Sequence, residues 1–167
     1  MKARYHNFGA FAWLAAIATI GILSSCDPHR VFEENREIKG GTWNVLDTIS
    51  FQVEIRDSIH PKNIYINIRN SGTYAYSNLF MFVTIKFPNG KMSKDTVECI
   101  LADQKHWLGR GLGGLWDHQI LYRNQVRFPL LGRYTITYEQ AQRSGAKAFI
   151  EDLPGIEDVG VRIEKHQ

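Results

Sequence analysis

Cysteine is scarce in this sequence, since the 167 residues include only Cys26 and Cys99. Cys26 follows an N-terminal leader and is expected to be lipidated, so Cys99 is left without a partner for an intramolecular disulfide, and the fold must depend on its apolar core. A domain of about 150 residues buries close to 70% of its unfolded surface, so it needs no cross-links. Cys99 lies in the segment Val97-Glu98-Cys99-Ile100-Leu101, where we expect a small core residue rather than a nucleophile.

A marked excess of charge of one sign is also missing. The net charge is +3, and Lys2 and Arg4 in the leader contribute two of these charges, so the rest of the chain is nearly neutral. Proteins that bind nucleic acid carry a strongly basic surface. We therefore expect no nucleic-acid partner.

The one long hydrophobic run lies at the N-terminus. Residues 1–4 include two basic side chains, residues 8–23 carry no charge, and Leu23-Ser24-Ser25-Cys26 follows. A basic start, an apolar centre and small residues before a cleavage site are the parts of an export signal. The ending resembles a bacterial lipobox, in which the cysteine is acylated. The sequence predicts a lipoprotein signal peptide over residues 1–25 and lipidation of Cys26; the alternative is an uncleaved single-pass anchor, for which the run is short.

These features predict a protein of the cell envelope, attached to a membrane by the lipid on Cys26. They leave the choice between inner and outer membrane open. Residues 26–41 are rich in charge and lack a periodic apolar pattern, so we interpret them as a lipid-anchored tether, although Val31 and Phe32 could pack onto the domain. The domain itself is expected over residues 42–167.

From Thr42 onward, apolar residues recur at every second position, which is the pattern of a half-buried strand. Pro88-Asn89-Gly90 predicts a hairpin turn, because Asn-Gly tolerates the positive φ of a tight turn. Residues 139–150 could form one short helix, which Gly145 weakens. The pattern predicts strands around residues 49–55, 64–69, 79–87, 96–101, 119–122, 125–128, 134–138 and 159–163.

About eight short strands, joined by turns rich in Gly, Pro and Asn, predict an all-β fold. The regular alternation and the absence of a repeat favour a single antiparallel β-sandwich of the jelly-roll or immunoglobulin-like type.

Motifs that would indicate an enzyme are missing. The loop Gly109-Arg110-Gly111-Leu112-Gly113-Gly114 lacks the Lys-Ser/Thr ending and the helix of a phosphate-binding loop. The six histidines lack the spacing of a zinc site, and no Gly-x-Ser-x-Gly motif is present. Asp103, Asp117, Glu157 and Asp158 could still pair across space in a glycosidase-like cleft, although acids at strand ends are usually solvated turn residues. We expect no catalytic residue, cofactor or metal.

Apolar side chains gather around this glycine-rich loop. These side chains either tuck into the core or mark a partner-binding surface, and the sequence favours neither; they are Trp107, Leu108, Leu112, Leu115 and Trp116. Our candidate interaction surface takes the loop and the 153–160 segment together, because these apolar and glycine-rich segments fall on loops rather than strands. Its residues are Trp107, Leu112, Leu115, Trp116, Leu153 and Ile156.

A carbohydrate-binding surface is the alternative function. Aromatic rings suit the faces of sugars, but they also fill the cores of sandwiches, as Tyr134 and Tyr138 are expected to do. The aromatic residues that could form a sugar platform are Trp43, Tyr65, Tyr74, Tyr76, Trp107 and Trp116.

A set of short segments, spread from the Leu-Ser-Ser-Cys26 box to the end of the chain, is specific when taken together. These segments are Tyr65-Ile-Asn-Ile-Arg-Asn70, Ser77-Asn-Leu-Phe80, Phe87-Pro-Asn-Gly90, Glu98-Cys-Ile-Leu-Ala-Asp103, Trp107-Leu-Gly109, Arg127-Phe-Pro129, Glu139-Gln-Ala141 and Leu153-Pro-Gly-Ile-Glu-Asp-Val-Gly160.

In these segments the chain resembles the gliding-motility lipoproteins called GldH, found in the Bacteroidetes. The resemblance implies a membrane-anchored accessory of the gliding machinery, a system linked to type IX protein secretion, with other envelope proteins of gliding or secretion as partners. It implies no catalytic residues. The residues and the resemblance both predict a non-catalytic scaffold or interaction module.

Overall fold

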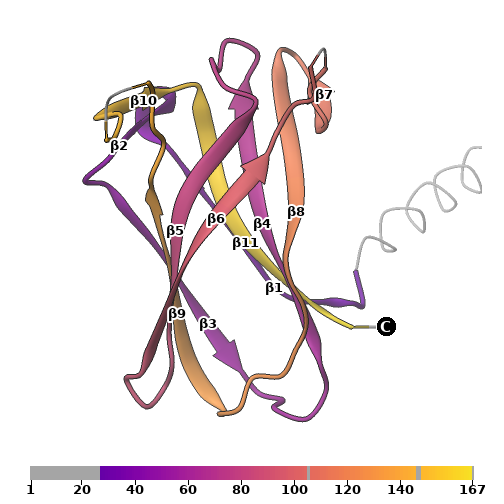
Figure 1. The fold of residues 1–167 in the computed structure, drawn as a ribbon. Helices are drawn as coiled ribbons and strands as arrows, with labels where there is room; N and C mark the ends of the chain where they lie inside the picture. Colours follow the sequence, from indigo (N-terminus) through magenta and orange to yellow (C-terminus); the bar gives the residue numbers. More distant parts are fainter. Residues whose placement is uncertain (1–26, 105, 146–147, 167) are drawn as a thin grey trace, which may run out of the picture.

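The computed structural model describes residues 27–104, 106–145 and 148–166, which are mostly extended strands joined by turns (Figure 1). The predicted signal peptide and Cys26 lie outside the described residues. No helix within these described ranges is long and apolar enough to cross a bilayer. In chain order the elements are β1 (Arg30–Glu37), the 3-10 helix η2 (Lys39–Gly41), β2 (Thr42–Asn44), β3 (Thr48–Ile55), β4 (Lys62–Ser71), β5 (Asn78–Lys86), β6 (Met92–Ile100), β7 (Arg110–Leu112), β8 (Leu115–Val126), β9 (Gly132–Gln140), β10 (Asp152–Pro154) and β11 (Ile156–Lys165).

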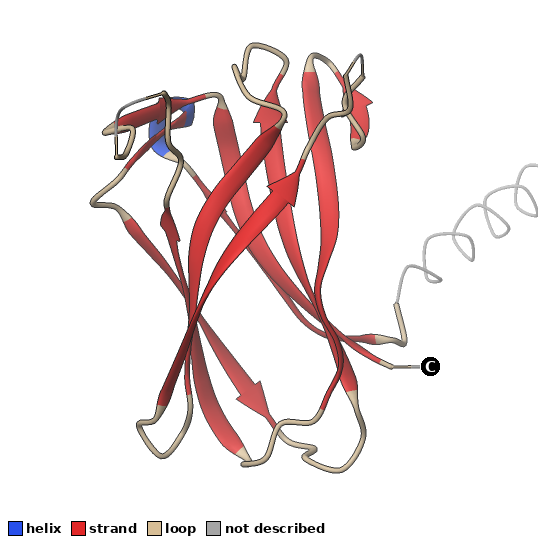
Figure 2. Cartoon of the chain, in the orientation of Figure 1, coloured by secondary structure: helices blue, strands red, loops and turns tan. Residues whose placement is uncertain are grey.

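The long strands form two antiparallel sheets that pack face to face (Figure 2). One sheet has the strand order β1-β11-β4-β8-β7 and the other has the order β3-β9-β5-β6, while β10 and β2 form a separate two-stranded sheet. The predicted antiparallel β-sandwich is confirmed. The described chain adds β1 and the three short strands β2, β7 and β10 to the predicted set.

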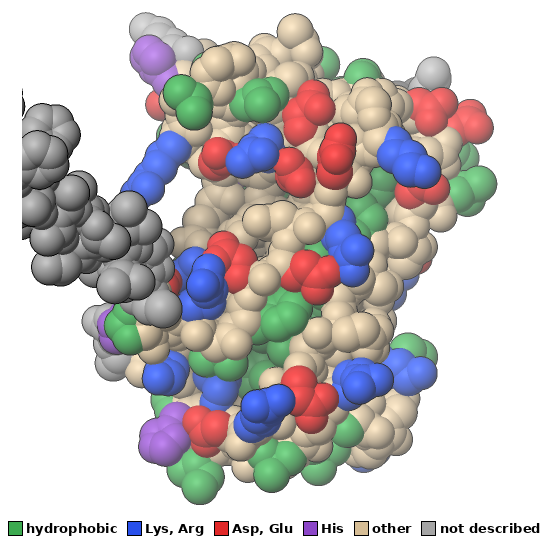
Figure 3. All heavy atoms as spheres, turned by 180° about the vertical axis from the view of Figure 1, so that it is seen from behind, with side chains coloured by type: hydrophobic (Ala, Val, Ile, Leu, Met, Phe, Trp, Pro, Cys, Tyr) green, Lys and Arg blue, Asp and Glu red, His purple; other side chains and the backbone are tan. Residues whose placement is uncertain are grey.

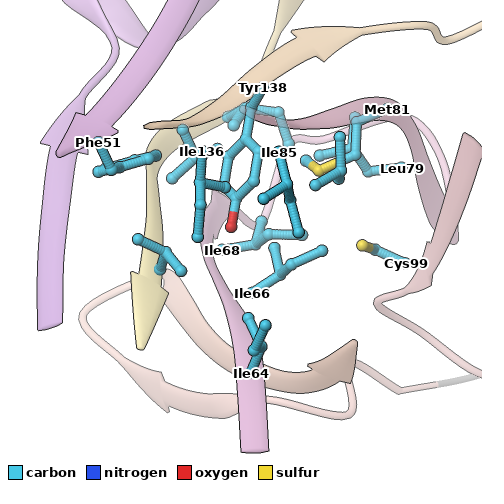
Figure 4. Close-up of a cluster of buried hydrophobic side chains, with 14 of the residues drawn as sticks. Phe51, Ile64, Ile66, Ile68, Leu79, Met81, Ile85, Cys99, Ile136 and Tyr138 are labelled. Carbon is cyan, nitrogen blue, oxygen red and sulfur yellow. The ribbon is translucent and has the colours of Figure 1, made fainter. Parts of the chain in front are cut away.

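Side chains that alternate along the strands meet between the two sheets and form the core (Figure 4). Ile66 of β4 and Val161 of β11 are fully buried from one sheet, as is Tyr138 of β9 from the other. The Tyr138 hydroxyl donates a hydrogen bond to the Gly160 carbonyl oxygen at 3.2 Å, and its ring meets the Phe51 ring edge-on at 5.3 Å. This hydrogen bond satisfies a buried polar group and joins the two layers.

Cys99 is a core residue, as the sequence predicts. Its side chain on β6 is fully buried, and burial raises the pKa of the thiol to about 12. A thiol in this environment stays protonated and unreactive at neutral pH.

The interpretation of residues 26–41 as a tether is wrong from Arg30 onward. β1 pairs with β11 from Arg30 to Glu37, Phe32 packs against the core, and Ile38 is buried in it. The folded domain therefore begins at Arg30 rather than Thr42, and only residues 27–29 separate it from Cys26.

Two other expectations are corrected. The strands predicted at residues 119–122 and 125–128 fall largely within a single strand, β8, in which Gln125 takes a positive φ of 54°. The short helix considered for residues 139–150 is absent from the described part of that segment. β9 continues to Gln140, and the buried side chain of Gln142 accepts a hydrogen bond from the backbone N–H of Phe80 at 2.9 Å, which holds the chain extended.

β4 runs the length of the sandwich and defines its two ends. At Lys62, β4 lies beside Lys165 of β11 and Val126 of β8, whereas at Ser71 it lies beside Leu115. A strand rises by about 3.3 Å per residue, so these two ends are about 30 Å apart. We refer to them as the Lys62 end and the Ser71 end.

Candidate functional site

The glycine-rich loop of the sequence is a β-hairpin at the Ser71 end. β7 pairs with the start of β8, so that Gly111 lies opposite Trp116 and Leu112 lies opposite Leu115. The turn consists of Gly113 and Gly114, which have φ values of 61° and 84°. Two successive residues with positive φ are the requirement of a tight hairpin turn, and glycine meets it without strain.

Two tryptophans form the base of this β7–β8 hairpin. The Trp107 and Trp116 rings lie 5.8 Å apart between centroids, and Trp107 also lies 6.4 Å from the buried Tyr74 ring. Trp116 fits closely between Gly72 and Gly111, since a Cβ atom at either glycine would lie less than 3 Å from the indole. The tryptophans therefore fix the hairpin to the core rather than forming its outer surface.

Backbone hydrogen bonds hold the hairpin and the preceding loop in place. The N–H of Leu108 donates to the carbonyl of Leu101, and the N–H of Gly72 donates to the carbonyl of Gly114, both at 2.9 Å. The hairpin is thus connected to the end of β6 and to the end of β4. Its position is determined by the sandwich and not only by its own turn.

Leucines, by contrast, point outward from the same segment. Leu112 is 84% exposed, Leu108 is 57% exposed and Leu115 is 36% exposed. Single exposed leucines are common, but three on one short segment form an apolar patch of the kind that marks an interaction site. Leu112 and Leu115 of the predicted surface are brought together here, and Leu108 joins them.

Besides the two tryptophans, two further members of the predicted surface do not belong to it. Leu153 pairs with Trp43 between β10 and β2, and both side chains are fully buried. Ile156, the first residue of β11, is also fully buried. These side chains stabilise the core and cannot contact a partner.

A buried histidine lies beneath the hairpin. His118 of β8 is 6% exposed, and its Nε2 donates a hydrogen bond to Oδ1 of Asn70 at 2.8 Å. Burial lowers the pKa of His118, and the charge of Asp117 partly opposes this shift. The geometry is that of a neutral imidazole that closes a polar contact inside the sheet. Across the ranges that the structure describes, no group of three or more His, Cys, Asp or Glu side chains is placed to hold a metal ion.

A polar hollow adjoins the hairpin on the outer face of the five-stranded sheet. Its volume is about 750 Å³, and Leu108 and Arg110 form its border on the hairpin side. Within it, Arg69 Nε lies 2.6 Å from Asp117 Oδ1, and Arg69 Nη1 lies 3.2 Å from Asp158 Oδ2. Figure 3 shows acidic and basic side chains around a hollowed area on this side of the molecule. No local sequence pattern indicates this hollow, because its residues come together through strand register.

The acids considered for a glycosidase-like cleft are only partly brought together. Asp117 and Asp158 share the Arg69 guanidinium, and burial raises the pKa of Asp158 although Arg69 opposes the shift. Asp103 instead accepts a hydrogen bond from a backbone N–H in its own loop, and Glu157 lies beside η2. Two carboxylates held by one arginine are an arrangement typical of structural ion pairs.

The aromatic platform considered for sugar binding is not formed as a single surface. Trp43 is fully buried and Tyr74 is 5% exposed. Tyr74 instead connects Tyr76 and Trp107 in a series of ring contacts that continues to Trp116. These rings support the loops of the Ser71 end from the inside.

Residues 30–163 match the family model described as "GldH lipoprotein". The chain belongs to this family. It is 39% identical over 158 residues to the "Gliding motility lipoprotein GldH homolog" of Christiangramia forsetii, covering 93% of this chain and 96% of that GldH protein. It is 36% identical over 154 residues to the "Gliding motility lipoprotein GldH" of Flavobacterium johnsoniae, covering 91% and 92% of the two chains.

Solved structures give a weaker similarity. The chain is similar to infectious bursal disease virus VP2 in a subviral particle (TM-score 0.35, 15% identity) and to the structure of the Gx strain of that virus (TM-score 0.37, 16% identity). In both cases the aligned region covers 81% of this chain and 30% of the viral chain.

Membership of the GldH family confirms the resemblance seen in the sequence. The protein is a gliding-motility lipoprotein, and the family's lipoprotein name places it in the cell envelope, attached to a membrane. These names refer to motility and to lipid attachment, and they name no reaction.

Proposed function

We propose that this GldH protein is a non-catalytic scaffold, held on a membrane by the lipid on Cys26, that binds another protein of the gliding machinery through the β7–β8 hairpin. The observation that carries the proposal is the exposure of Leu108, Leu112 and Leu115 on a segment whose tryptophans fix it to the core. A rigid apolar surface loses little conformational freedom when it binds, so more of its contact energy remains as affinity.

The surroundings of the leucines also suit a protein partner. Leu108 and Arg110 border the polar hollow, so a partner that covers the leucines also meets the charged groups around Arg69. An apolar centre with a polar rim is the usual composition of a protein interface. Because the lipid confines the protein to a membrane, partners on the same membrane meet it at high effective concentration, and a modest interface is sufficient.

Type IX secretion is the second part of the proposal. We infer that the partner belongs to the apparatus shared by gliding and secretion, so that loss of the hairpin surface affects both processes. The support for this part is the family assignment together with the link between the two systems that the resemblance implies.

Replacing exposed leucines in the source organism tests the proposal. A strain with Leu112→Gln and Leu115→Gln should lose colony spreading and change the set of proteins in the culture supernatant, while the level of the protein stays normal. Leu46→Gln is the matched control, because Leu46 has the same 84% exposure as Leu112 but lies outside the hairpin. Normal spreading of the double variant at a normal protein level would show that the hairpin is not the interface.

A Cys26→Ala strain in the same series separates anchoring from binding. Metabolic labelling with a fatty-acid probe should mark the wild-type and the leucine variants but not Cys26→Ala. Equal labelling of Cys26→Ala would contradict the lipid anchor, whereas a labelled but non-spreading leucine variant would locate the defect in the hairpin.

A further inference from the structure

The Lys62 end of the sandwich has side chains that the proposed function does not use. Its loops lie close together, since Ile55 pairs with Gly132 and Pro88 packs against Gly132. The three loops at this end are residues 56–61, 87–91 and 127–131.

The surface formed by these loops is basic. Arg56, Lys86, Lys91 and Arg127 are exposed, and none of them forms an ion pair with another residue in the described part of the chain. Figure 3 shows basic side chains along this lower end of the molecule.

Acidic residues at the Lys62 end are already neutralised. Asp57 Oδ2 lies 3.0 Å from Nζ of the buried Lys62, and Glu54 Oε2 lies 4.0 Å from Nε of Arg133. The positive charge of the loops is therefore left without local compensation.

Exposed apolar side chains lie among these basic groups. Ile59 is 73% exposed, Leu131 is 58% exposed, and Met92, the first residue of β6, is 70% exposed. Basic residues interspersed with protruding apolar ones are the composition by which proteins bind the headgroup region of an anionic bilayer.

The Ser71 end has the opposite charge. Residues 151–158 alone include four acidic residues and no basic one, and acidic side chains predominate along the upper end in Figure 3. An anionic surface would therefore attract one end of the domain and repel the other.

The point where the chain leaves the domain is also at the Lys62 end. Asp27, which follows Cys26 in the sequence, accepts hydrogen bonds from the His29 N–H at 3.0 Å and from the guanidinium of Arg162. The N–H of Lys165 in turn donates to the His29 carbonyl at 2.8 Å. Because Lys165 pairs with Lys62, the chain that leads to Cys26 is fixed to the basic end.

We propose that the Lys62 end rests on an anionic lipid surface, with Arg56, Lys91 and Arg127 on the headgroups and Ile59 and Leu131 between them. This inference rests on the attachment at residue 26 in the proposed function. It adds an orientation of the domain on the membrane. The β7–β8 hairpin is held about 30 Å from the end that contacts the lipid, so an envelope protein can reach the hairpin.

Fluorescence quenching in vesicles tests this orientation. The full mature protein is placed in vesicles of phosphatidylethanolamine and phosphatidylglycerol that contain a headgroup spin label, with a fluorophore on Leu131→Cys or on Leu112→Cys. These matched variants report one end each, and the buried Cys99 does not react with the fluorophore. We expect strong quenching at position 131 and none above background at position 112; equal quenching, or more at position 112, would overturn the proposal.

Charge variants identify the cause of the orientation. R56Q/K91Q/R127Q should abolish the difference in quenching, whereas K39Q/R110Q/R143Q, which removes three exposed basic side chains at the Ser71 end, should preserve it. An undiminished difference in the first variant would overturn the contact between these residues and the lipid.

The same preparation separates this proposal from the anchor itself. Its mass shows whether acyl chains are present, and their absence would contradict lipidation of Cys26. In that case Cys26 is a free thiol, so it is replaced by serine before labelling; the quenching difference then still decides the orientation, because an uncleaved leader also joins the domain at residue 26.

Discussion

Two short segments at the Ser71 end have nearly the same sequence pattern and opposite surroundings. Leu112-Gly113-Gly114-Leu115 connects β7 to β8, and Leu153-Pro154-Gly155-Ile156 connects β10 to β11. Each segment begins and ends with an apolar residue, and its third residue is a glycine with positive φ. Leu112 is 84% exposed, whereas Leu153 is fully buried.

The difference arises from what lies beyond each strand. β10 is covered by β2, whose fully buried Trp43 lies opposite Leu153, so this turn closes the end of the core. β7 is the edge strand of its sheet, and no strand of the described chain lies beyond it. An apolar turn therefore becomes part of the surface or of the core according to its neighbours, and not according to its own residues.

The largest effect expected from this comparison is on stability. Leu153→Ala should lower the free energy of unfolding by about 2–5 kcal/mol, because it leaves a cavity in a packed core. Leu112→Ala should change it by less than about 0.5 kcal/mol, because the side chain is mostly in solvent. Urea unfolding followed by tryptophan fluorescence measures both variants, and similar losses in the two would contradict the burial described above.

An intermediate effect is expected at the two turn glycines. Gly114 and Gly155 have φ values of 84° and 92°, so alanine at either position costs about 1–2 kcal/mol of backbone strain. At Gly155 the new Cβ would also lie 2.9 Å from the Cα of Tyr74, whereas at Gly114 it would meet nothing within 4 Å. Gly155→Ala should therefore lower the urea midpoint more than Gly114→Ala does; the reverse order would show that Tyr74 moves aside.

The smallest expected effect depends on pH and acts near the hairpin. Burial holds the pKa of His118 below its ordinary value of 6.5. Between the folded and unfolded pKa values, His118 is therefore protonated in the unfolded chain and neutral in the folded chain. The free energy of unfolding is therefore unaffected by this titration above about pH 6.5, and it decreases as the pH falls from about 6.5 toward the lower pKa of the folded state. His118→Gln keeps a donor for Asn70 and removes the titration. Urea midpoints above and below this pH should converge in the variant, and an unchanged pH dependence would exclude His118 as its source.

Much of the sandwich was predictable because its central strands are buried on one face. Phe51, Val53 and Ile55 alternate with polar residues along β3, and the structure buries all three. β1 was missed because it is an edge strand in which charged Glu34 and Arg36 lie opposite the buried Val161 and Val159, so the apolar period of two is broken on its inner side.

The candidate site was only partly predictable for a related reason. The sequence places Leu112 and Leu115 near a glycine-rich turn, but exposure depends on whether another strand covers that turn. The association of Asp117 and Asp158 with Arg69 depends on the register of three strands, β8, β4 and β11, that are far apart in the chain. No local pattern records such a register.

The strand order β1-β11-β4-β8 also determines how the domain responds to a pulling force. In the proposed function the chain is attached to the membrane through residue 26, which precedes β1 at the Lys62 end, and the partner binds the hairpin at the Ser71 end. Tension between membrane and partner would then run along the strands. Hydrogen bonds in antiparallel pairs lie across that direction. These hydrogen bonds would therefore be loaded together in shear, instead of breaking one after another. Such resistance to force suits a component of a machine that moves a cell.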